Sequence, residues 1–88
     1  MIYANDLSFT PRTIRVKKGM RVQVLFIVDR KDTYYGGLDI RSDTFRTGTI
    51  APGQRQTVEF TADESFSFQS FWPSTSALKA TGRVEVVE

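Results

Sequence analysis

The side chains that most often carry catalysis, electrons or transition metals are missing from this chain. It contains no histidine and no cysteine, so imidazole and thiolate ligands for zinc or copper are not available. Ser70 and Lys79 could form a serine–lysine nucleophile pair, but no glycine-rich elbow or oxyanion loop accompanies them. There is no convincing pair of carboxylates for acid–base chemistry. We therefore predict that the domain is not an enzyme.

Carboxylates remain as possible ligands for a hard cation. Asp39 and Asp43 are close in sequence, but they lack the dense spacing of oxygen ligands that calcium sites use. We therefore expect no metal and no cofactor.

Four aromatic residues form two adjacent pairs, Tyr34–Tyr35 and Phe71–Trp72. Large aromatic side chains are frequent anchors of protein interfaces. They also fill hydrophobic cores. The sequence leaves both interpretations open.

Basic residues are concentrated in one short stretch. Such a cluster could attract phosphate or an acidic partner. It also suits the solvent-facing side of an edge strand, where charge discourages aggregation, and we favour this interpretation. Acidic residues interleave with the other basic residues, so we predict no nucleic-acid binding. Five of the twelve basic residues lie here: Arg12, Arg15, Lys17, Lys18 and Arg21.

The length of 88 residues and the net charge of +2 suit one small globular domain spanning residues 1–88. No apolar run approaches the roughly 20 residues that span a bilayer, so we expect no membrane insertion by this segment. No signal peptide is recognisable. A leader or membrane anchor would lie on a missing segment if the chain is part of a longer protein.

Apolar residues recur at every second position, which is the period of β-strands. The pattern predicts strands over 14–17, 22–28, 34–40, 57–62, 65–69 and 82–86, with 71–81 irregular. Pro52 and Gly53 are typical of the central residues of a type II turn. About seven short strands separated by turns predict an all-β Greek-key sandwich or barrel.

Several segments resemble the cupredoxin family of azurin, plastocyanin and the copper domain of cytochrome oxidase subunit II. Residues 9–19, with Phe9, Pro11, Ile14, Val16 and Gly19, are similar to the family's entry pattern F-x-P-x-x-I-x-V-x-x-G. Residues 50–53 are similar to its I-x-P-G turn, and residues 82–86 resemble its last strand. The resemblance covers nearly the whole chain and implies a cupredoxin-like fold.

The resemblance also implies where copper ligands would stand. The family uses a histidine near the middle and a cysteine, a histidine and usually a methionine near the end. Gly36 takes the first position, Ser70 the cysteine position, Thr75 the second histidine position and Lys79 the methionine position. None of these residues suits copper. Ser70 shares the inward phase of Phe66 and Phe68, so it should be a buried hydroxyl bonded to Thr75 or to the strand of Gly36.

The leading hypothesis from this resemblance is a metal-free cupredoxin-like domain that acts as a protein-interaction or structural module. Its partner would be another protein or a neighbouring domain. Cupredoxins are usually exported, so we expect an extracytoplasmic location, periplasmic or extracellular, within a larger protein, with or without a membrane anchor on a missing segment. The family docks its redox partners at the apolar end of the sandwich beside the metal. The expected partner surface is therefore Tyr34, Tyr35, Phe71 and Trp72, with Lys79 and Arg30 at its rim.

Two alternatives stay open at this point. In the first, the chain is a copper electron-transfer domain whose ligands were lost or removed, which leaves only a scaffold. In the second, it is an immunoglobulin-like adhesion domain. The sequence identifies neither the partner, the parent protein nor the oligomeric state, and it does not say whether the ligands were lost naturally or by engineering.

Overall fold

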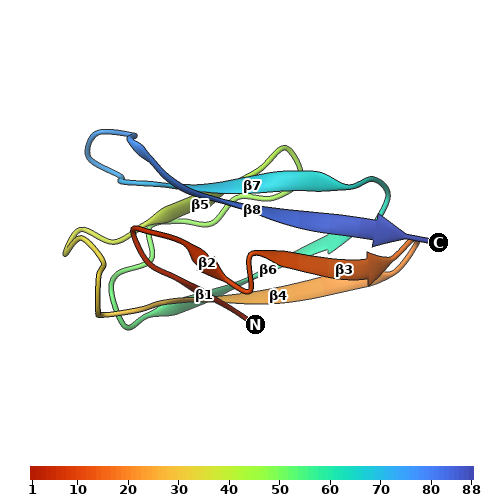
Figure 1. Cartoon of the computed structure of the whole chain (residues 1–88), viewed down its shortest axis with the longest axis horizontal. Coiled ribbons are helices and arrows are strands. Elements are labelled where there is room, and N and C mark those ends of the chain that lie inside the picture. Colours follow the sequence, from red (N-terminus) through yellow and green to blue (C-terminus); the bar gives the residue numbers. More distant parts are fainter.

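Two four-stranded sheets face each other in the computed structural model, which describes residues 1–88 (Figure 1). The first sheet has the strand order β2-β1-β4-β6, and the second has the order β3-β8-β7-β5. None of its elements is a helix that could cross a membrane. The strands are β1 (Ile2–Ala4), β2 (Phe9–Thr10), β3 (Thr13–Lys17), β4 (Arg21–Val28), β5 (Asp39–Arg41), β6 (Arg55–Thr61), β7 (Phe66–Phe71) and β8 (Leu78–Val87).

The alternating pattern of the sequence decides which face of each strand is buried. Val24, Phe26 and Val28 of β4 are buried between the sheets, as are Val58 and Phe60 of β6. Successive side chains on a strand point to opposite faces, so the residues between them face solvent or are only partly covered. The predicted all-β sandwich is confirmed.

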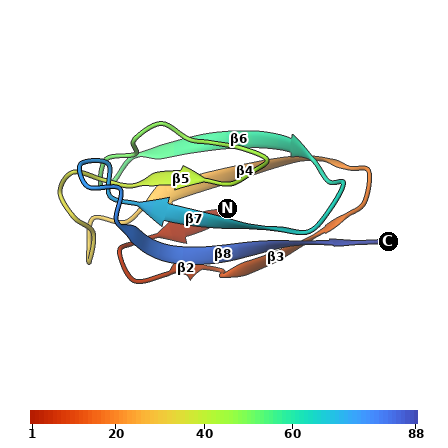
Figure 2. The ribbon, with the colours of Figure 1, turned by 90° about the horizontal axis from the view of Figure 1, so that it is seen from above.

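Both sheets mix parallel and antiparallel pairing. β1 runs parallel to β4, and β3 runs parallel to β8, while the other pairs are antiparallel. The chain passes from the first sheet to the second between β2 and β3. The strands follow the long axis of the molecule, so the connections gather at its two ends (Figures 1 and 2).

One of these ends is called here the loop end and consists of residues 5–8, 29–38 and 72–77. The connections β4–β5 and β7–β8 lie together at the left of both views (Figures 1 and 2). The β1–β2 connection joins them, because the Asp6 amide donates a hydrogen bond of 3.0 Å to the Asp32 carbonyl. Segments far apart in sequence therefore form one surface.

There are eight strands rather than about seven, because β1 and β2 lie outside the predicted ranges, and the largest differences in strand boundaries are at β5 and β8. The strand predicted over 34–40 is limited to β5, because Gly37 has φ +85° and closes a turn with its amide on the Tyr34 carbonyl at 2.9 Å. A Cβ at position 37 would collide with the Ile50 carbonyl oxygen. The last strand begins at Leu78, not at Gly82, because its pairing with β7 continues past Ala80 through a bulge between Ser70 and Phe71.

The turn predicted at Pro52 and Gly53 is present. Gly53 has φ +85°, and the Gln54 amide donates to the Ala51 carbonyl at 2.9 Å. A positive φ at the third residue of a turn is the requirement of type II geometry.

Phenylalanine dominates the space between the sheets. Phe68 is fully buried, and its ring centroid lies 4.7 Å from Phe9 and 5.5 Å from Phe26 with edge-to-face geometry. Its ring also covers Gly82, its cross-strand neighbour on β8, where a Cβ would collide with the ring. We call this group the phenylalanine core: Phe9, Phe26, Phe45, Phe60, Phe66 and Phe68.

Candidate interaction site at the loop end

Three aromatic rings and one ammonium group stack at the loop end. The ring centroid of Tyr35 lies 4.4 Å from that of Tyr34, which lies 4.9 Å from that of Trp72. The Nζ atom of Lys79 is 3.8 Å from the centroid of the Trp72 ring. A cation over an indole ring is attracted by its π-electrons. These four residues are called the aromatic stack.

Asp6 fixes the middle of the aromatic stack. Its Oδ1 atom accepts a hydrogen bond of 3.1 Å from Trp72 Nε1, and its Oδ2 atom accepts one of 3.0 Å from the Tyr34 amide. One carboxylate thus joins the β4–β5 connection to the β7–β8 connection. Hydrogen bonds from N–H groups to a charged oxygen are stronger than those to a neutral oxygen, so the Asp6 carboxylate holds these two connections together.

The β7–β8 connection is closed by its own hydrogen bonds. The Trp72 amide donates to the Ala77 carbonyl at 3.1 Å, and the Ser76 amide donates to the Trp72 carbonyl at 2.8 Å. The Ala77 amide also donates to Thr75 Oγ1 at 3.3 Å. The connection therefore holds Trp72 in place without help from a bound group.

The outer member of the aromatic stack faces solvent. Tyr35 is 84% exposed, whereas Trp72 is partly buried and packs against the core. The pKa of Tyr35 is raised above its ordinary value by hydrogen bonding to the Tyr34 hydroxyl and then by the charge interaction between the two phenols. Beside the stack lies a shallow depression of about 410 Å³, which the exposed Leu7 borders. Its lining is Asp6, Leu7, Asp32, Thr33, Tyr34 and Trp72.

The residues assigned to copper-ligand positions do not form a set of donors for copper. Gly36 has no side chain, and the Tyr34 ring fills the space that a Cβ there would need. Ser70 is fully buried, and its Oγ accepts from the Ala80 amide at 3.1 Å. Its partner is thus Ala80 on β8, and not Thr75 or the strand of Gly36 as we expected. Thr75 Oγ1 already accepts from its own loop, and the ammonium of Lys79 lies against Trp72.

A copper site would need one thiolate and two imidazoles, which this arrangement cannot supply. No group of three acidic, histidine or cysteine side chains that could hold a metal ion is present elsewhere. The correspondence of these four positions to the family's ligands stays a prediction from the sequence.

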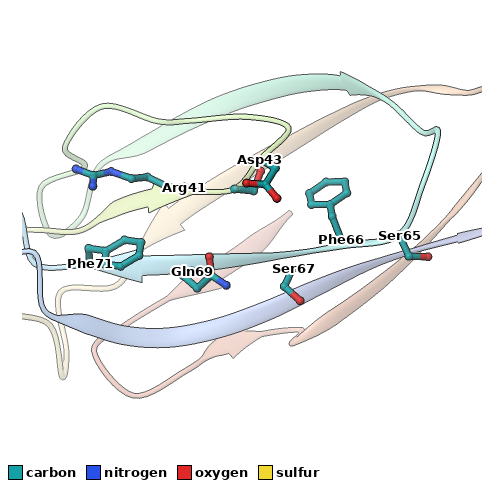
Figure 3. A pocket seen from close by; sticks show the side chains of 8 residues that line it. Arg41, Asp43, Ser65, Phe66, Ser67, Gln69 and Phe71 are labelled. Atoms are coloured by element: carbon teal, nitrogen blue, oxygen red, sulfur yellow. The ribbon is translucent and has the colours of Figure 1, made fainter.

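Two residues predicted for the same surface lie outside the aromatic stack. Phe71 points away from the core on the outer face of β7, where the Arg41 guanidinium lies 5.4 Å from its ring. Phe71 and Arg41 line a shallow groove of about 450 Å³ together with side chains from β7 (Figure 3). The Arg30 side chain lies over Gly53 at the turn before β6.

The two aspartates considered as ligands for a hard cation lie in different environments. Asp39 is buried, and its carboxylate accepts from Thr49 Oγ1 at 2.6 Å and from the Arg41 guanidinium at 3.1 Å. Asp43 is exposed and lines the groove of Figure 3. Asp39 therefore serves the fold.

The basic cluster lies mainly on the edge strand β3 and at the start of β4, with exposed side chains. Arg15 pairs with Glu85 at 3.2 Å, and Arg21 pairs with Glu59 at 3.3 Å. Surface pairs of this kind contribute little to stability, and they offset much of the local positive charge.

Sequence reasoning missed Asp6. Its two partners lie 28 and 66 residues further along the chain, so no local pattern marks it. Its position next to Asn5, whose Oδ1 caps the turn to Leu7 and Ser8, indicates only a loop.

Comparison with known proteins identifies the fold. No family model matches the sequence, and no curated protein matches it. The structure is similar to reduced auracyanin from Roseiflexus castenholzii, with a TM-score of 0.72, 14% identity, and coverage of 99% of this chain and 94% of that one. A purple cupredoxin from Nitrosopumilus maritimus gives a TM-score of 0.62 at 15% identity, covering 90% of this chain and 81% of the other. A copper nitrite reductase from Nitrosomonas europaea gives 0.64 at 21% identity, covering 84% of this chain and 29% of the enzyme.

The chain therefore has the cupredoxin β-sandwich fold. It is a cupredoxin fold without cysteine, histidine or a metal site. This fold assignment replaces the immunoglobulin-like alternative.

Proposed function

We propose that this domain is a metal-free protein-interaction module that binds another protein through its loop end. The observation that carries the proposal is the outermost ring of the aromatic stack, because Tyr35 is 84% exposed although it belongs to an ordered array. A tyrosine held this way offers contact area at a small entropic cost and a hydroxyl for hydrogen bonding.

The order of the site supports binding. Asp6 and Lys79 fix Trp72 from two sides, so little freedom remains to be lost when a partner docks. Preorganised surfaces bind more tightly for this reason. The exposed Leu7 extends the apolar area next to the ring of Tyr34.

The likeness to one part of a longer copper nitrite reductase supports a role within a larger protein, since such domains are found inside longer chains. We propose that the parent protein is extracytoplasmic, because cupredoxins, whose fold this chain shares, are usually exported. The domain would have no catalytic role there.

Site-specific photo-crosslinking tests the interaction. A benzoylphenylalanine at position 35 of the full-length protein, in the cells that produce it, should form one discrete protein adduct. The same group at Glu64, an exposed residue in the turn before β7, is the matched control. The purified partner should then bind the wild-type protein, and Tyr35→Ala should weaken this binding by roughly tenfold or more.

Equal adducts from both positions, or none from position 35, would count against the loop end as the binding surface. Unchanged affinity in Tyr35→Ala would count against the stack in the same way. A melting curve of Tyr35→Ala that matches the wild type shows that a loss of binding is not a loss of fold.

Copper titration tests the metal-free part separately. Calorimetry with Cu(II), and with Cu(I) under reducing conditions, should detect no stoichiometric binding to the wild-type domain, because no thiolate or imidazole is present. Tight one-to-one binding would overturn this part and leave the interaction test unaffected.

A further inference from the structure

The two sheets have four edges, and three of them are poorly suited to pairing with a second copy of the chain. β2 is only two residues long. β5 is covered by the segment 46–50, since the Thr47 amide donates to Ile40 and the Ile50 amide donates to Leu38, each at 2.9 Å. β3 is the basic strand with Arg15 and Lys17, so pairing with a copy of itself would oppose like charges.

The fourth edge, β6, presents unpaired backbone groups. The Val28 amide donates to Gln54 at 3.0 Å, and the Ala62 amide donates to Met20 at 2.9 Å. Hydrogen-bonded pairs alternate along an antiparallel ladder, so the even-numbered residues of β6 bond to β4. The N–H and C=O groups of the odd-numbered residues, Arg55, Thr57 and Glu59, therefore point away from the sheet.

Nothing in the same chain takes up these groups. No backbone hydrogen bond from a turn or loop reaches Arg55, Thr57 or Glu59. The neighbouring segment 46–50 bonds to β6 only through the Gln56 side chain, whose Oε1 accepts from the Gly48 amide at 3.1 Å. β6 lies at the outer margin of its sheet (Figure 2).

The charges along this edge match a second copy of the chain in one register. If two β6 strands pair antiparallel about a two-fold axis at Thr57, Arg55 of each copy stands opposite Glu59 of the other. Both side chains are exposed, and opposite charges across a strand pair are stabilising. A parallel pairing in register would instead place Arg55 beside Arg55 and Glu59 beside Glu59.

We infer that the domain forms a symmetric dimer in which the two β6 strands pair antiparallel about Thr57. The dimer joins two four-stranded sheets into one continuous sheet, with a self-complementary interface as two-fold symmetry requires. The interface follows the side of the sandwich and leaves the aromatic stack uncovered. The inference is thus independent of the proposed function.

Sedimentation velocity over a range of concentrations tests the dimer, with four variants beside the wild type. Thr57→Pro removes an N–H that only the second copy would use, and proline is tolerated on a strand edge whose N–H faces solvent. Thr57→Val keeps this N–H and is the matched control. Arg55→Glu places carboxylates opposite each other, and the double variant Arg55→Glu with Glu59→Arg restores opposite charges.

The wild type and Thr57→Val should show a concentration-dependent dimer. Thr57→Pro and Arg55→Glu should raise the dissociation constant roughly tenfold or more, and the charge-swapped double variant should recover most of the loss relative to Arg55→Glu. Melting curves separate this result from unfolding, which matters because Glu59 also pairs with Arg21 and Gln23 within its own copy. A wild type that stays monomeric, or a dimer that none of the variants weakens, would overturn the inference.

Discussion

The phenylalanine core and the aromatic stack use the same class of side chain in opposite ways. The core rings carry no polar atom and pack mostly edge to face between the sheets, with Phe68 fully buried. The three rings of the aromatic stack, Tyr34, Tyr35 and Trp72, each carry a polar atom, and Trp72 Nε1 donates its hydrogen bond to Asp6. The stack ends in the exposed ring of Tyr35.

The difference follows from what holds each group. The core rings are fixed by contact with one another and with neighbouring apolar side chains, which the hydrophobic effect drives. The stack has solvent on one side and is fixed instead by the Asp6 carboxylate and the Lys79 ammonium. Damage to the core should therefore cost stability, and damage to the stack should cost order and binding.

The largest effect is expected from Phe68→Ala. Removal of a buried phenyl ring leaves a cavity and typically costs about 3–5 kcal/mol of unfolding free energy, which a domain of this size can hardly tolerate. Tyr35→Ala should change the unfolding free energy by less than about 0.5 kcal/mol. Urea denaturation of both variants measures the contrast, and equal losses would show that the stack belongs to the core.

A smaller effect is expected from Asp6→Ala. The change leaves Trp72 Nε1 and the Tyr34 amide without their acceptor, which should cost about 1–3 kcal/mol. Tryptophan fluorescence should shift to longer wavelength as Trp72 becomes more solvated. Asp6→Asn keeps one acceptor oxygen, so its stability and its emission wavelength should fall between those of the wild type and Asp6→Ala. An Asp6→Ala spectrum identical to that of the wild type would argue that Asp6 does not hold Trp72 in place.

A still smaller effect is expected at Lys79. Lys79→Gln removes the cation over the Trp72 ring, and such contacts contribute about 0.5–1 kcal/mol at exposed sites. Lys79→Arg keeps a cation and should retain most of this stability. The thermal midpoints of the two variants provide the measurement, and identical values would mean that the charge does not act through the ring.

The smallest effect is expected from Tyr34→Phe, which should leave the unfolding free energy nearly unchanged. It should lower the pKa of Tyr35 toward its ordinary value of 10.0, because the Tyr34 hydroxyl is the main cause of the rise. The raised pKa favours the protonated folded state, so its contribution to stability is complete below pH 10.0 and falls as pH rises through the folded pKa. Absorbance titration of tyrosinate decides the point, and an unchanged Tyr35 titration would refute the assignment.

Local signals in the sequence were sufficient for much of the fold. The alternation over β4 and β6 reflects one buried face per strand, and the Pro52–Gly53 turn needs only its own residues. The short length of β5 was not predictable, since the turn at Gly37 depends on a close approach of its backbone to Ile50, which lies on a later segment. The start of β8 depends in the same way on its pairing with β7.

The candidate site was predictable in part. The structure brings together Tyr34, Tyr35, Trp72 and Lys79, but not Phe71 or Arg30. Neighbours on a strand face opposite sides, so the inward phase of Ser70 already indicates that Phe71 lies on the outer face of the sheet. Asp6 had no signal, since its role comes only from long-range contacts.

The bond from Asp6 to Trp72 joins residues that are 66 positions apart. The loop end therefore exists only after most of the chain has been synthesised and both sheets have met. Contacts of such long sequence separation form slowly because the intervening loop must close first. A fragment ending before β7 would contain Tyr34, Tyr35 and Asp6 but no completed surface, so recognition through this end would report that folding is finished.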